Sequence, residues 1–139
     1  MTWLDPAEVA AYANRRTRAT NQYQIQQAQN SYNRGTTGAN QATSTRNLTT
    51  QFDKMRTNLP GQYARRGLLN SGIYAQGLQD YGTGRTSAFG DLAQRYQQQF
   101  GQFDLNDQAA SVNYNDTIGE IYDQEAVRRS QVAAALRGF

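Results

Sequence analysis

Apolar and aromatic residues recur along this chain at spacings of three and four, the period of one face of an α-helix. A first helix is predicted from Asp5-Pro6, because Asp5 can cap the free amides of the first turn and Pro6 suits the first helical position. It is expected to run to about Arg34 and to end at Gly35, with a loop over Gly35–Ala39. The stripe along this helix is narrow and consists mainly of Ala, Tyr and Gln, which favours packing against neighbouring helices over covering an apolar core.

A second, clearer stripe consists of Leu48, Phe52, Met55 and Leu59. This helix is expected to end at Leu59, because Pro60 disfavours helical geometry in the residue before it. A short helix over Gln62–Arg66, ended by Gly67, is predicted next, and Ser71 or Asn70 is expected to cap the helix that follows the turn.

The second half of the chain predicts either one long interrupted helix or a pair of helices, with a weak point or kink at Gly82–Gly84. Its main stripe, which we expect to be buried against the stripe around Phe52, comprises Phe89, Leu92, Tyr96, Phe100 and Phe103. No strand is predicted, since β-branched residues never alternate over a useful run. The expected fold class is therefore all-α, with long helices and a helix-turn-helix break near residues 60–72.

The composition indicates an assembly subunit rather than a self-sufficient domain. Leu, Ile, Val and Phe together supply 22 of the 139 residues, whereas Gln and Asn supply 29, and the net charge is only +3. So few core formers can bury little apolar surface in one chain. We expect residues 1–139 to be a single elongated helical subunit ordered by oligomeric assembly, with a basic N-terminal arm over 1–59 and a C-terminal helical region over 60–139.

Several classes of function are excluded by residue type. The chain has no Cys and no His, which removes disulfides, thiolate or imidazole metal sites and the common nucleophilic triads. No apolar window is long enough to predict a membrane span, and residues 1–13 lack the basic start and apolar run of a signal peptide. We therefore expect no enzyme activity, no cofactor and no secretion signal.

The remaining candidate chemistries are weak. Asp116, Glu120 and Asp123 share a helical face but lack a chelating loop, so a solvated face or a partner for Arg is the better interpretation. A hydrolase acting through Glu120 or Asp123 stays as an alternative, although no apolar cleft is predicted to tune either group. Glu125 and Arg129 are spaced to form an ion pair along one helix. The glycine-rich segment 77–86 has Arg85 where a phosphate loop needs Lys.

Charge is distributed unevenly along the chain. Residues 1–52 carry five Arg against two acids, whereas residues 86–139 carry four Arg against seven acids. This asymmetry suits head-to-tail contacts between identical subunits. The basic residues of the first part, with tyrosines between them, are also candidates for contact with DNA: Arg15, Arg16, Arg18, Arg34 and Arg46. The other interpretation is that these Arg side chains bind acids and carbonyls of neighbouring subunits.

The segment Gln62–Ile73, followed by Gly77–Tyr81 and a helix rich in Gln, Tyr and Asp, resembles small helical structural proteins of tailed bacteriophages. The turn ARRGLLNSGI between two helices carries most of this resemblance. It implies a non-enzymatic virion component at the portal, neck or tail, made in the host bacterial cytoplasm and assembled with copies of itself and other virion proteins. It assigns no catalytic residue. A virion protein that contacts or channels the genome is the alternative.

The turn at Gly67–Gly72 is the expected pivot and attachment point. Leu68 and Leu69 cannot both face their own helices, so we expect at least one of them to enter an apolar pocket on a partner. The other residues predicted for this partner interface are Arg65, Arg66 and Tyr74. The alternative is that the two leucines close the core of their own chain at the bend.

Overall fold

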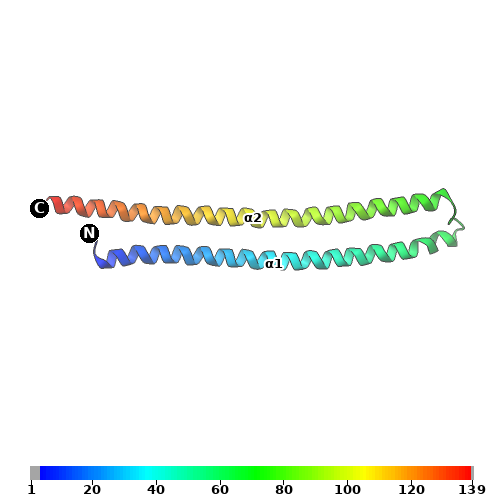
Figure 1. Ribbon diagram of the computed structural model, residues 1–139, viewed down its shortest axis with the longest axis horizontal. Coiled ribbons are helices and arrows are strands. Elements are labelled where there is room, and N and C mark those ends of the chain that lie inside the picture. Colours follow the sequence, from blue (N-terminus) through cyan, green and yellow to red (C-terminus); the bar gives the residue numbers. More distant parts are fainter. Residues whose placement is uncertain (1–3, 139) are drawn as a thin grey trace. The chain divides into compact units, whose positions relative to one another are not determined.

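The computed structural model describes residues 4–138 and consists of two long helices joined by a short turn (Figure 1). Helix α1 spans Pro6–Arg65 and helix α2 spans Gly72–Arg137. The described residues include no strand. The predicted all-α fold class and the helix break within residues 60–72 are confirmed.

The start of α1 follows the predicted capping chemistry. The Asp5 carboxylate accepts a hydrogen bond from the amide of Ala7 at 3.0 Å, and Pro6 is the first helical residue. Glu8 adds a negative charge in the first turn, where the helix dipole favours it. Leu4, just before the cap, is buried.

The predicted end of the first helix at Gly35 and the loop over Gly35–Ala39 are wrong, because α1 continues through them. The predicted end at Leu59 is also wrong, and Gln62–Arg66 is not a separate helix, because Pro60 lies inside α1, which ends at Arg65. A helical Gly costs only about 1 kcal/mol relative to Ala, which packing against a second helix can offset. Pro60 and Arg56 are exposed, so water can satisfy the Arg56 carbonyl that loses its amide partner.

The turn between the helices forms as expected. Gly67 has a φ of 70°, and the amides of Gly67 and Leu68 donate to the carbonyls of Ala64 and Tyr63 at 3.0 and 2.9 Å. This is the Schellman arrangement, in which a left-handed residue satisfies the last free carbonyls of a helix. The hydroxyl of Ser71 then accepts a hydrogen bond from the amide of Tyr74 at 3.4 Å. Gly67 as the helix stop and Ser71 as the next cap are both confirmed.

Helix α2 is one continuous helix through the expected weak point at Gly82–Gly84. A β-carbon added at Gly82 or Gly84 would meet nothing within 4 Å, so these glycines are not required by a close approach. The predicted interruption of the helical second half is therefore wrong, because α2 continues unbroken through this segment.

The chain divides into two compact units, each containing a segment of both helices. The terminal unit consists of Met1–Tyr32 with Phe103–Phe139, and the turn unit is Asn33–Gln102. In each unit the two segments run antiparallel: Arg16 meets Glu125 while Tyr23 meets Tyr114, and Ser44 meets Tyr96 while Tyr63 meets Tyr74.

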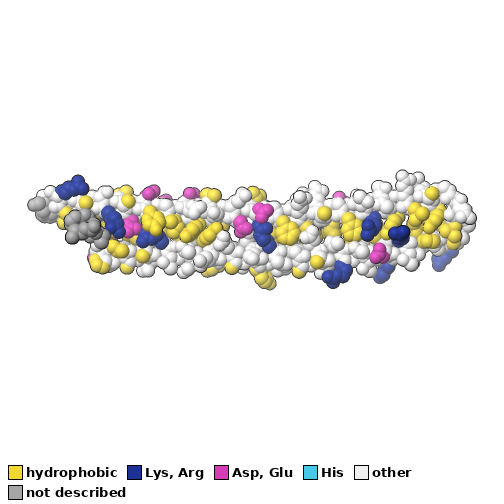
Figure 2. Space-filling model, in the orientation of Figure 1, with side chains coloured by type: hydrophobic (Ala, Val, Ile, Leu, Met, Phe, Trp, Pro, Cys, Tyr) yellow, Lys and Arg dark blue, Asp and Glu magenta, His cyan; other side chains and the backbone are white. Residues whose placement is uncertain are grey.

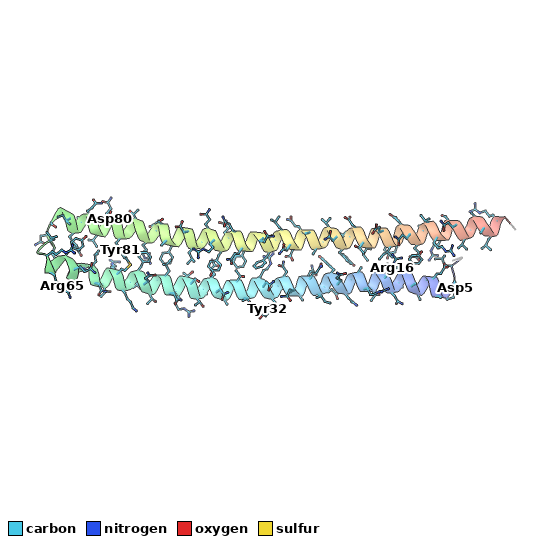
Figure 3. The ribbon with its side chains drawn as sticks, turned by 180° about the vertical axis from the view of Figure 1, so that it is seen from behind. Asp5, Arg16, Tyr32, Arg65, Asp80 and Tyr81 are labelled. Atoms are coloured by element: carbon cyan, nitrogen blue, oxygen red, sulfur yellow. The ribbon has the colours of Figure 1, made fainter. Side chains whose placement is uncertain are left out.

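The turn unit is centred on a small aromatic cluster. The ring of Phe52 lies 5.8 Å from that of Tyr81 and 6.2 Å from that of Phe89, measured between centroids. Figure 3 shows Tyr81 on the side of α2 that faces α1, and its hydroxyl donates to the Phe52 carbonyl at 2.9 Å. Phe52 and Tyr96 are buried as predicted, whereas the prediction for Met55 is wrong, since it is 47% exposed. Other members of the two stripes in this unit are half-buried: Leu48, Leu59, Phe89, Leu92 and Phe100.

The core between the helices is thin. The buried apolar residues among those described are Leu4, Phe52, Tyr96 and Ile121, and none of the described side chains is fully enclosed. Eleven large apolar side chains are exposed among the described residues. Figure 2 shows hydrophobic side chains, alanines included, mainly along the seam between the helices and at scattered points on their outer surfaces. Two helices cover only one stripe of each other, so most of each helix surface has no apolar partner within its own unit.

Candidate interaction surface

A charged network joins the two helices in the terminal unit. The guanidinium of Arg16 lies 2.6 Å from one carboxylate oxygen of Glu125, and that of Arg129 lies 2.7 Å from the other. Figure 3 shows Arg16 on the side of α1 that faces α2, and its guanidinium also stands 4.7 Å above the ring of Tyr122. The predicted Glu125–Arg129 pair along one helix is confirmed.

Electrostatics in this network favour the charged form of Glu125. Its carboxylate accepts hydrogen bonds from Arg129 and Arg16, and these lower its pKa below the ordinary value of 4.5. At the same end of the unit Arg128 donates two hydrogen bonds to Glu8, and these raise the pKa of Arg128 above its ordinary value. Glu125 of the C-terminal segment therefore pairs with Arg16 of the N-terminal segment within one chain, whereas the Arg128–Glu8 pair joins the two segments in the opposite sense. The Arg16–Glu125 pair therefore neutralises, within one chain, charges that were predicted to serve contacts between subunits.

The five Arg residues predicted to contact DNA have different surroundings. Arg16 is committed to Glu125, and Arg15 donates to the Gln124 side chain at 2.7 Å. Arg18 and Arg46 are exposed, in the terminal unit and the turn unit respectively, whereas Arg34 is half-buried. The set is therefore not one continuous exposed patch.

The residues predicted for a partner interface lie together at the helix turn. Arg65, Arg66 and Leu69 are exposed, and Leu68 is half-buried. Tyr74 packs edge-on against Tyr63, with 5.2 Å between ring centroids, and so belongs mainly to the chain's own turn packing. Ile73, at the start of α2, is 58% exposed and extends the apolar surface of the turn, and it was not among the residues predicted for the interface.

A shallow groove runs between the helices of the terminal unit. One part is lined by Arg15, Arg18, Glu120 and Ile121, and the adjoining part by Gln26, Tyr23, Ala110, Asn113 and Tyr114, with Ala19, Gln22 and Thr117 common to both. The floor contains the stacked rings of Tyr23 and Tyr114, 4.6 Å apart, and the Tyr114 hydroxyl is 3.0 Å from the Thr20 hydroxyl. Alanines and amides therefore line a surface with Arg15 and Arg18 on one wall and Glu120 on the other.

The acidic residues of α2 do not form a chelating site. Asp116, Glu120 and Asp123 line an open surface depression, and residues 4–138 contain no cluster of three acidic side chains placed to hold a metal ion. The described helices also contain no segment long and apolar enough to cross a membrane.

Polar contacts between the helices were missed from the sequence. The buried amide of Asn30 donates to the Asp107 carboxylate at 2.5 Å and to the Phe103 carbonyl at 2.9 Å. Ser44 and Tyr96 pair through their hydroxyls at 3.0 Å. The sequence signal for Asn30 is weak. It lies three residues after Gln27 and so continues the three- and four-residue spacing of the first helix by one position.

Comparison with known proteins finds no matching family model, no similar curated protein and no similar solved structure. The fold defines the chain as an all-α protein in which segments of two long helices pair antiparallel within each unit.

Proposed function

We propose that this chain is a non-catalytic structural subunit that assembles with copies of itself and with other proteins through the outer surfaces of its helices. The observation that carries the proposal is the thin core, with four buried apolar side chains against eleven large exposed ones among the described residues. Burial of apolar surface contributes about 25 cal/mol per Å². Association that covers the exposed side chains supplies the stabilisation that two helices lack.

Within this proposal, the turn is the attachment point. Leu69 is 41% exposed, Ile73 is 58% exposed, and both lie beside the exposed cations Arg65 and Arg66. An apolar contact surrounded by Arg donors is typical of protein interfaces. A phage portal, neck or tail is the setting that the sequence resemblance implies, and detection of the chain in purified particles tests that setting.

The variant L68S/L69S tests the attachment point. We expect it to keep its helical circular dichroism and to lose association with its assembly, because the turn hydrogen bonds are made by the backbone and by Ser71. A matched control is Q97S/Q98S, which shortens two exposed polar side chains of α2 in the same unit and removes no apolar surface. Co-purification of the variant with the assembly measures its incorporation, and sedimentation velocity on the purified wild-type chain measures self-association. A wild-type chain that stays a folded monomer at every concentration contradicts the proposal.

Nucleic-acid contact is the second candidate, and a specific observation favours the turn unit for it. Residues 33–102 contain eight Lys and Arg side chains against three acids, and all eight cations except Arg34 are exposed. Binding through phosphates loses affinity steeply with salt. Fluorescence anisotropy of labelled double-stranded DNA across a salt series tests this candidate, and R65E/R66E is expected to weaken binding. A salt-independent or undetectable signal argues against it.

A further inference from the structure

The groove of the terminal unit carries opposite charges on its two walls. Arg18 is on the α1 wall and Glu120 is on the α2 wall, at the same level along the pair, since both line the same part of the groove. Both side chains are exposed, and no ion pair joins them within the described chain. Arg18 and Glu120 are therefore available to charges on another molecule.

The rest of the groove suits a helix as its neighbour. Its lining residues recur at spacings of three and four on both walls, including Ala19, Gln22 and Gln26 on α1 and Ala110, Asn113 and Thr117 on α2. Alanine permits close approach of a further helix, and side-chain amides and hydroxyls can donate and accept hydrogen bonds across the contact.

Symmetry decides which charges would meet in a dimer. A two-fold axis parallel to the helices and lying in the contact plane places α1 of one copy over α2 of the other at the same level. Each Arg18 then faces the Glu120 of the partner copy, and the pairing occurs twice because a two-fold contact is isologous. All neighbouring helices run antiparallel, which is the geometry of an up-down four-helix bundle.

We propose that this groove is the docking surface for a second copy of the chain, related by such a two-fold axis, with Arg18 and Glu120 as the charge pair that sets its alignment. This inference rests on the proposed function, since it assigns a face and a partner to self-association. Charge complementarity selects the occupant. The Glu120 carboxylate repels the phosphates of a nucleic acid, and an apolar partner would leave the amides of the lining without hydrogen bonds, whereas a second copy offers Arg18 to Glu120.

Charge reversal in separate chains tests the proposal directly. R18E and E120R each place two like-charge pairs in the symmetric contact, so each variant alone is expected to dimerise at least ~10-fold more weakly than the wild type. In an equimolar mixture of the two variants both pairs are again attractive, and a heterodimer is expected with affinity within about threefold of the wild type. Sedimentation velocity on the full chains measures all three.

The control is R46E, which makes the same charge change at an exposed position of the turn unit and is expected to associate like the wild type. Circular dichroism verifies that every variant keeps its helices. If the single variants associate like the wild type, or the mixture fails to restore association, the groove is not the contact, whereas the proposed function stands as long as the wild type self-associates. A wild-type chain that never associates overturns both.

Discussion

At the scale of single residues, the glycines inside α2 differ in what surrounds them. A β-carbon at Gly77 would lie 2.7 Å from Cζ of the Tyr63 ring, which is packed against Tyr74. The same β-carbon at Gly84, in the same helix, meets nothing within 4 Å. The ring of Tyr63 in α1 therefore packs directly over Gly77 in α2, so this contact joins residues on opposite sides of the turn.

Alanine substitution at these two glycines is expected to have different effects. G84A should raise the free energy of unfolding by about 0.5–1 kcal/mol, because Ala is the better helix former at an open position. G77A should gain at least ~1 kcal/mol less than G84A, because Tyr63 must move away from Tyr74 to make room. Urea unfolding of both variants measures the difference. Equal stabilisation by G77A and G84A would show that the packing of Tyr63 does not need a glycine at position 77.

Stability is expected to depend on acid pH through Glu125. The pKa of this carboxyl is lowered in the folded chain, so its ion pairs stabilise the fold above the ordinary pKa of 4.5. That contribution is lost as pH falls from 4.5 through the lower, folded-state pKa. E125Q should therefore be less stable than the wild type at pH 7, and the difference should shrink at pH 3. Urea unfolding at pH 7 and pH 3 measures the difference in stability between the two proteins. A difference that is the same at both pH values contradicts a lowered pKa for Glu125 in the folded chain.

At the scale of helices, tertiary packing overrides the local stop signals inside α1. Gly35 and Pro60 are helix breakers by residue type, and nothing in a single sequence shows that a partner segment will hold them helical. In contrast, Gly67 and Ser71 end one helix and begin the next through hydrogen bonds to residues only a few positions away. The turn could therefore be predicted from the sequence, while the helix lengths could not.

The pairing of the helices in the turn unit depends on Phe52. F52A should lower the free energy of unfolding by about 3 kcal/mol, because it removes the ring that contacts both Tyr81 and Phe89. M55A is the matched control, because Met55 lies on the same helix and is 47% exposed. It should change the free energy of unfolding by no more than about 0.5 kcal/mol. Thermal unfolding monitored by circular dichroism compares the two. Similar losses would mean that Met55 is covered in solution.

At the scale of the whole chain, the unfolding temperature is expected to rise with protein concentration. Association binds the folded chain and so stabilises it by mass action. Because 1 kcal/mol shifts the unfolding temperature of a chain of this size by about 2–4 °C, a 100-fold increase in concentration should raise it by several degrees. Scanning calorimetry at two concentrations measures the shift. A temperature independent of concentration would indicate a chain that is stable as a monomer.

The sequence by itself determined the all-α class, the position of the turn, its Gly67 stop and Ser71 cap, and the Glu125–Arg129 pair, because each depends on helix periodicity or on residues within one turn of each other. The tertiary structure decided that Arg16 pairs with Glu125 and that Arg15 pairs with Gln124, each contact joining residues 109 positions apart. It also decided that Met55 is exposed and that Asn30 is buried. Such outcomes depend on which segments of the two helices pack together, and a weakly apolar stripe of Ala, Tyr and Gln does not specify that alignment in advance.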